Sequence, residues 1–147
     1  MKTTLVTTTL ALLFVTFAGS TAQAQPTAEE VTRACIQRIG RITEAGLREM
    51  GHECRRTVNL VEELVDQGRI EAAREAAERG ATVVTRTARS TIGAVHMTAR
   101  ECLQILHRLG ADPELARRIA RAAERSERIV RGVRDRCLRA IQAALEG

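Results

Sequence analysis

Apolar and small residues recur every three or four positions through most of this chain, and this spacing constrains its fold more than any other feature. Residues with that spacing share one face of an α-helix, so the pattern predicts long amphipathic helices. Runs from Cys35 to Cys54 and from Leu115 through Ile129 to Ala144 show it, and such stripes are typical of helices packed at shallow angles in a bundle. The longest run is Ile70, Ala73, Ala77, Ala81, Val84, Ala88, Ile92, Val95, Ala99, Cys102, Leu106 and Leu109.

Helix start and stop signals divide the chain into three helices. Thr27 stands three residues before Glu30, which is the spacing of a capping box at a helix N-terminus. Gly68 and Gly110 are residues of the kind that end helices, and Asp112-Pro113-Glu114 combines a cap, a first-turn proline and a first-turn acid. We therefore expect an all-α, antiparallel (up-down-up) three-helix bundle, with helices over residues 27–66, 69–109 and 112–145.

Glycines inside the expected helices leave one alternative open. Each glycine in a helix interior costs about 1 kcal/mol relative to alanine. A break near Gly51 or Gly80 would turn the three long helices into four or five shorter ones. The spacing alone does not decide between these two arrangements.

The first 24 residues have the composition of a secretory signal peptide. A positive charge at Lys2 precedes an apolar run from Leu10 to Ala18, and the small-residue triplet Ala22-Gln23-Ala24 follows. This order predicts cleavage after Ala24. The apolar run is shorter than the roughly 20 residues that span a bilayer, so we do not expect a membrane anchor. We expect residues 25–147 to form a single exported domain, periplasmic or secreted.

Aromatic side chains are absent from this expected mature domain. Phe14 and Phe17 are the only Phe, Tyr or Trp residues of the chain, and both lie in the expected signal peptide. Stacking on exposed nucleic-acid bases and anchoring by Trp or Tyr at a membrane surface are therefore both disfavoured.

Four cysteines in an exported chain indicate two disulfides, and the expected helices select one pairing. Cys35 and Cys54 lie 19 residues apart on one helix, about 28 Å along its axis, and so cannot bond to each other. Counting residues along antiparallel helices places Cys35 opposite Cys102, and Cys137 close to the level of Cys54. The crossed pairing would have to bridge about 25 Å twice. We therefore predict the disulfides Cys35–Cys102 and Cys54–Cys137.

A metal-binding or redox site is the alternative use of these cysteines. His52, Cys54 and Cys137 form the one cluster of ligand types that the expected helices bring to a common level. The sequence contains no compact zinc, haem or metalloprotease motif, and we expect no cofactor. It also contains no nucleophile elbow, phosphate loop or nucleotide-binding fingerprint, so we expect a non-enzymatic protein.

Arginine is distributed unevenly along the expected bundle. Lys2 is the only lysine, so residues 25–147 hold 22 Arg against 18 Asp and Glu, a net charge of +4. Six of the acids fall within residues 62–78, whereas residues 79–100 hold four Arg and no acid. The levels of the helices then predict a basic face that comprises Arg86, Arg89, Arg131, Arg134 and Arg136.

Two interpretations of this basic face remain open. It could bind a polyanion or an acidic protein partner. Alternatively, ion pairs between an acid and the arginine four residues later, such as Glu127 with Arg131, would make it an ordinary solvated surface. The sequence therefore predicts an exported, non-enzymatic structural or binding module, with a metal-binding or redox protein as the alternative. It leaves the partner open, and also whether the chain forms homo-oligomers.

Overall fold

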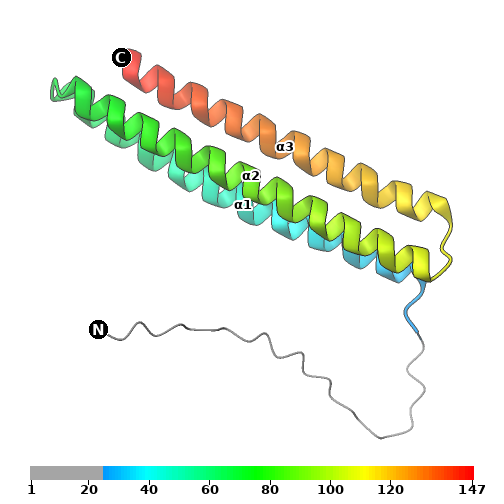
Figure 1. Ribbon diagram of the computed structural model, residues 1–147. Coiled ribbons are helices and arrows are strands. Elements are labelled where there is room, and N and C mark those ends of the chain that lie inside the picture. Colours follow the sequence, from blue (N-terminus) through cyan, green and yellow to red (C-terminus); the bar gives the residue numbers. More distant parts are fainter. Residues whose placement is uncertain (1–24) are drawn as a thin grey trace, which may run out of the picture.

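The computed structural model describes residues 25–147, and the predicted signal peptide, residues 1–24, lies outside the described residues. Three α-helices make up almost all of the described chain: α1 (Ala28–Asp66), α2 (Ile70–Arg108) and α3 (Pro113–Glu146). Each helix begins and ends within one residue of the range expected from the sequence. They form an up-down-up bundle in which every helix packs against the other two (Figure 1), so the predicted fold class is confirmed.

Side-chain caps fix where α1 and α3 begin. Glu30 N donates a hydrogen bond to Thr27 Oγ1 (3.2 Å), and Thr27 N donates one to the Glu30 carboxylate (2.8 Å), which completes the predicted capping box. At the start of α3, Asp112 accepts a hydrogen bond from Glu114 N (2.7 Å). These bonds satisfy backbone N–H groups that have no partner inside the helix.

Both turns use a glycine with a left-handed backbone. Gly68 ends α1 with a φ of 70°, and Gly110 ends α2 with a φ of 60°. At the first turn, Arg69 N donates to Leu64 O and Gly68 N donates to Val65 O, which is the Schellman pattern. Because both turns are short and reverse the chain, successive helices are antiparallel and α1 runs parallel to α3.

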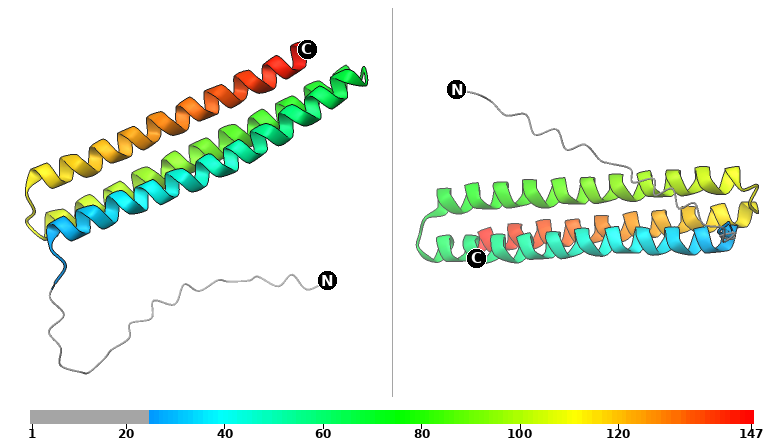
Figure 2. Two further views of the ribbon diagram at one scale, coloured as in Figure 1. Left: turned by 180° about the vertical axis from the view of Figure 1, so that it is seen from behind. Right: turned by 90° about the horizontal axis from the view of Figure 1, so that it is seen from below.

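The helices are continuous through their internal glycines. Neither Gly51 nor Gly80 interrupts its helix, so the arrangement with four or five helices does not occur among residues 25–147. Figure 2 shows the three helices running side by side along their whole length with little curvature. No stretch of α1, α2 or α3 has the length and apolar character that crossing a membrane requires.

The core contains three layers, and each layer has one apolar residue from every helix. All nine of these residues are at most 3 % exposed. Successive layers are 11 residues apart on all three helices, which corresponds to about 3.67 residues per turn. That value is close to the 3.6 of an isolated helix, so the helices pack without strong supercoiling. The layers are Ile39, Val95 and Ile119; Met50, Val84 and Val130; and Val61, Ala73 and Ile141.

The interface between α1 and α2 follows the same 11-residue period with small residues. A Cβ on Gly46 would lie 2.1 Å from Thr91 Oγ1, and a Cβ on Gly80 would lie 2.2 Å from Thr57 Oγ1, so the helices meet closely at both places. The disulfide between Cys35 and Cys102, with 6.2 Å between their Cα atoms, occupies the next position of the series. The first predicted disulfide is therefore confirmed, one residue from the level that counting gave.

Buried threonines widen the apolar stripe beyond the residues that the sequence pattern singled out. Thr32, Thr43 and Thr91 are each less than 10 % exposed, and each hydroxyl donates to the carbonyl oxygen four residues earlier, at 2.8–2.9 Å. This internal bond allows a threonine to occupy a core position without an unsatisfied polar group. Conversely, three residues expected in the stripe are more than 40 % exposed: Ile70, Leu109 and Ile129.

Candidate anion-binding site

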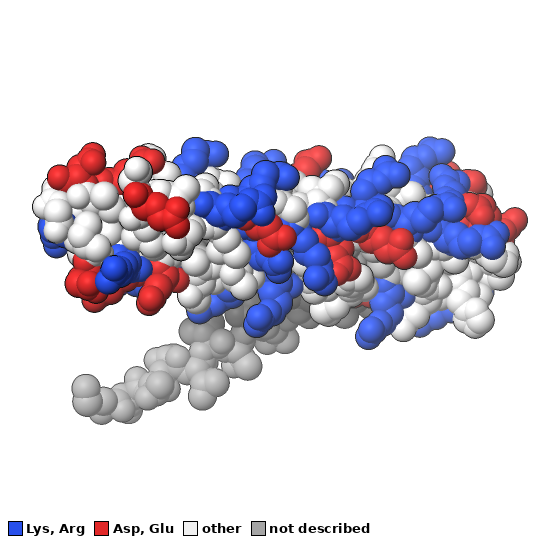
Figure 3. All heavy atoms as spheres, turned by 90° about the horizontal axis from the view of Figure 1, so that it is seen from above, with Lys and Arg blue, Asp and Glu red and all other residues white. Residues whose placement is uncertain are grey.

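Charge is separated along the length of the bundle. The end with the α1–α2 turn carries the acids of residues 62–78, and Figure 3 shows acidic side chains gathered there. In the same view, arginines cover much of the middle and the opposite end, with fewer acids between them. A basic region therefore lies toward the middle of the molecule, as the sequence predicts.

A groove between α2 and α3 concentrates part of this charge. One hollow of about 480 Å³ is lined on α2 by Thr82, Thr85, Arg86 and Arg89 and on α3 by Leu138. A second, of about 180 Å³, is lined on α2 by Thr85, Arg89 and Ile92 and on α3 by Arg131 and Arg134. The two hollows share Thr85 and Arg89, so they form one continuous surface. We call it the arginine groove and define it by Thr82, Thr85, Arg86, Arg89, Arg131 and Arg134.

Four of the five arginines predicted for the basic face thus line the arginine groove, from two helices. The fifth, Arg136, lines neither hollow. Its guanidinium instead reaches back over Gly132, where a Cβ would lie 3.7 Å from Arg136 Nη1. On a helix the two residues from Arg134 to Arg136 correspond to a rotation of about 200°, so both cannot face α2.

The arginines of the two helices differ in their partners. Arg131 Nε donates to the Glu127 carboxylate at 2.9 Å, and Arg134 Nε donates to Asp135 at 2.8 Å. Arg86 and Arg89 have no carboxylate within 4.0 Å among residues 25–147. The α2 side of the groove therefore carries two guanidinium groups that form no ion pair within the described chain, although Glu49 lines a neighbouring hollow together with Arg86.

Glu127 connects the two helices beside the groove. Its carboxylate lies 2.8 Å from Nε2 of His96 on α2, and it also accepts the bonds from Arg131. The hydrogen bond from His96 and then those from Arg131 hold the pKa of Glu127 below its usual value. An ionised Glu127 thus fixes the orientation of Arg131 and offsets part of its charge.

Guanidinium and hydroxyl groups together suit an oxyanion. The planar guanidinium donates two parallel hydrogen bonds to phosphate, sulfate or carboxylate, and threonine adds a single neutral donor. Thr85 lines both hollows of the groove, together with Arg86 and Arg89 in one and with Arg89, Arg131 and Arg134 in the other. The sequence pattern shows Thr82 and Thr85 only as part of a hydroxyl-rich stretch. Thr82 stands four residues before Arg86, and Thr85 four residues before Arg89, and this spacing is the signal that places each threonine beside an arginine on the same face.

A larger hollow, of about 730 Å³, lies between α1 and α2 over the Cys35–Cys102 disulfide. Its lining is mainly apolar, with Val31, Ala34 and Ile105 among its residues, and its charges are mixed. Arg38 there lies 3.4 Å from the Glu101 carboxylate. The arginine groove is the better anion site, because its lining contains arginine and no acid.

The remaining cysteines meet without forming the predicted bond. Cys54 of α1 packs against the cluster that contains Cys137 of α3, which confirms that they are neighbours. Both are free thiols, so the second disulfide is not formed in this structure. His52, the third residue of the alternative metal cluster, is exposed. Within the described residues, no three His, Cys, Asp or Glu side chains are placed to hold a metal ion.

Comparison of the chain with protein-family models, with curated proteins and with solved structures gave no match in any of the three.

Proposed function

We propose that this protein acts after export as a non-enzymatic binding module that holds a polyanion bearing phosphate or sulfate groups in the arginine groove. The observation that carries the proposal is the position of Arg86 and Arg89. They have no acidic partner among residues 25–147, and they line the same groove as Arg131 and Arg134 of the neighbouring helix.

The shape of the groove supports a ligand with several charges rather than one small ion. Arg86 and Arg89 are one turn apart on α2, and Arg131 and Arg134 are one turn apart on α3. An elongated ligand that lies along the groove would meet all four guanidinium groups. Because each helix is held by packing along its length, the groups are arranged before binding, which lowers the entropic cost of association.

The composition of the chain indicates how such a ligand would be recognised. Residues 25–147 have no Phe, Tyr or Trp with which to stack on bases or sugar rings. Recognition would therefore depend on charge and hydrogen bonding, and affinity should fall steeply as salt concentration rises.

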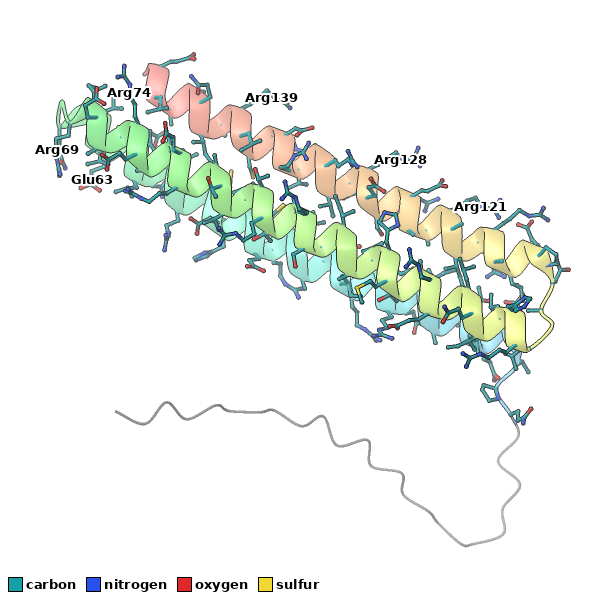
Figure 4. The ribbon with its side chains drawn as sticks, in the orientation of Figure 1. Glu63, Arg69, Arg74, Arg121, Arg128 and Arg139 are labelled. Atoms are coloured by element: carbon teal, nitrogen blue, oxygen red, sulfur yellow. A yellow bond between two sulfur atoms is a disulfide. The ribbon has the colours of Figure 1, made fainter. Side chains whose placement is uncertain are left out.

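The test compares two double variants that change the net charge equally. Arg89→Glu with Arg134→Glu reverses one charge on each side of the groove. The matched control, Arg128→Glu with Arg139→Glu, reverses two charges on the side of α3 that faces away from the other helices (Figure 4). Binding of the purified proteins to immobilised heparin and to inorganic polyphosphate is measured over a series of salt concentrations.

We expect the unmodified protein to bind at least one of the two probes. The groove variant should lose about tenfold or more in affinity, since a hydrogen bond to a charged group contributes about 1.5–3 kcal/mol. The control should lose much less. Equal losses in the two variants would show that general positive charge, and not the groove, binds the probe. Failure of the unmodified protein to bind either probe at low salt would overturn the proposal.

A further inference from the structure

Cys54 and Cys137 bring two thiols together between α1 and α3. Both belong to the packed cluster around Met50, Val84 and Val130, halfway along the bundle. They differ in accessibility, because Cys54 is half-buried whereas Cys137 is only 6 % exposed. One thiol of the pair can therefore meet a molecule from solvent, and the other lies behind it.

The surroundings of Cys137 keep this residue in the thiol form. Burial, and then the hydrogen bond with Cys54, raise the pKa of Cys137 to about 12, whereas the charge of Arg136 acts in the opposite direction. A thiol must lose its proton before it attacks a disulfide. The buried thiol of Cys137 is thus unreactive until a disulfide forms on the neighbouring Cys54.

We propose that Cys54 and Cys137 form a thiol–disulfide exchange site whose substrate is a small or protein disulfide from outside the chain, with Cys54 as the entry thiol and Cys137 as the resolving thiol. This site is separate from the Cys35–Cys102 disulfide, which joins α1 to α2 near one end of the bundle.

The exchange has two steps. The Cys54 thiolate attacks one sulfur of the external disulfide, so that a mixed disulfide forms on Cys54 and one external thiolate leaves. That thiolate, or water, takes the proton from Cys137, whose sulfur then attacks Cys54 and releases the second external thiol. Two protein thiols are thereby oxidised to one disulfide, and one external disulfide is reduced to two thiols.

The product would join α1 to α3. In the structure, α3 has no covalent link to the other helices apart from the short connection after α2, because the Cys35–Cys102 bond leaves it out. Oxidation of Cys54 and Cys137 to a disulfide would therefore join α3 covalently to α1, where packing alone now holds it.

The 11-residue period of the bundle supplies conservative variants for the test. Thr43 lies 11 residues before Cys54, and Ser126 lies 11 residues before Cys137. Both of these hydroxyl residues are less than 10 % exposed, so equivalent positions already accept a small polar side chain. Cys54→Ser and Cys137→Ser should therefore fold, and circular dichroism of each variant checks that the helical signal is unchanged.

The experiment exposes the purified protein to oxidised glutathione, traps the remaining thiols by alkylation and maps the products by mass spectrometry. The unmodified protein should acquire a Cys54–Cys137 disulfide and retain no glutathione. Cys137→Ser should accumulate one glutathione on Cys54. Cys54→Ser should leave Cys137 as a thiol, with glutathione added at least tenfold more slowly than to Cys54 in the other variant.

Three results would overturn the proposal. The first is an unmodified protein that keeps both thiols, or that carries glutathione on both of them, in excess oxidised glutathione. The second is the absence of an adduct on Cys54 in the folded Cys137→Ser variant. The third is an equally rapid reaction of Cys137 in Cys54→Ser, which would show that Cys54 is not the entry thiol.

Discussion

Gly80 of α2 lies directly against Thr57 of α1, where a Cβ on the glycine would come within 2.2 Å of Thr57 Oγ1. Alanine is the better helix former by about 1 kcal/mol. We nevertheless expect Gly80→Ala to lower the free energy of unfolding by about 1–2 kcal/mol, because overpacking of a tight interface outweighs the gain in helix propensity. Urea denaturation followed by circular dichroism measures the change.

The matched control for this prediction is Gly93→Ala on the same helix. Nothing lies within 4 Å of the position that its Cβ would take, and Gly93 is exposed. Alanine there should raise the free energy of unfolding by about 1 kcal/mol through helix propensity alone. If both substitutions changed stability in the same direction, close approach at Gly80 would not be what decides its effect.

Exchanging the two residues at this contact should restore much of the lost stability. The pair Gly46–Thr91 has its glycine on α1 and its threonine on α2, the reverse of Thr57–Gly80. Thr57→Gly alone leaves a gap, and Gly80→Thr alone collides with the threonine that remains. In the double variant, the glycine introduced at position 57 removes the collision, and the threonine introduced at position 80 fills the gap. We expect a favourable coupling of about 1 kcal/mol or more in a double-mutant cycle of unfolding free energies, and additive effects would contradict this reading.

Local signals and simple counting account for what the sequence could predict. The ends of the helices depend on single residues such as Thr27, Gly68 and Asp112, whose capping bonds form within a few residues of the chain. The partner of Cys35 followed from the rise per residue once the turn was placed, because both helices are long and unbroken. The same counting identified the four arginines that line the groove.

The sequence pattern failed where it had to choose between neighbouring residues on one helix. It placed Ile129 in the core, yet Ile129 is 43 % exposed and Val130 is fully buried. Steps of three and four residues drift around the helix relative to the true 11-residue period, so an error of one residue accumulates. The period itself is obscured because Thr43, Thr57 and Thr91 occupy buried positions without being apolar. Arg136 was wrongly assigned to the basic face for a related reason. Counting gives the level of a residue along the helix axis, but not the side of the helix on which its side chain lies.

The Cys35–Cys102 disulfide should contribute strongly to stability. It closes a loop with a sequence separation of 67 residues. The chain-entropy model assigns about 4 kcal/mol to a loop of that size. Cys35→Ala with Cys102→Ala should therefore lower the free energy of unfolding by up to about 4 kcal/mol in denaturant titrations. In the same titrations without reductant, the control, Cys54→Ser with Cys137→Ser, removes no bond because both cysteines are free thiols. A loss as large as that of the first variant would contradict the prediction.

Glu127 should make the stability of the bundle depend on pH in the acidic range. Hydrogen bonds from His96 and Arg131 lower its pKa in the folded protein below the usual value of a glutamate. A carboxyl group with a lowered pKa stabilises the fold above its unfolded-state pKa, and this contribution is lost as the pH falls through the folded-state value. Glu127→Gln should therefore lower Tm at neutral pH, and the difference from the unmodified protein should shrink below about pH 4. A difference that stays constant with pH would contradict this.

The same substitution should have the opposite effect on polyanion binding. Glu127 forms an ion pair with Arg131, so removal of its charge leaves a guanidinium of the arginine groove without this partner. Glu127→Gln should elute from heparin at higher salt than the unmodified protein. Glu124→Gln is the matched control, because Glu124 is an exposed acid of the same helix that makes no ion pair within residues 25–147. Both variants change the net charge by one unit, so a larger shift for Glu127→Gln would reflect the release of Arg131. Equal shifts would indicate that net charge, and not the release of Arg131, determines the affinity.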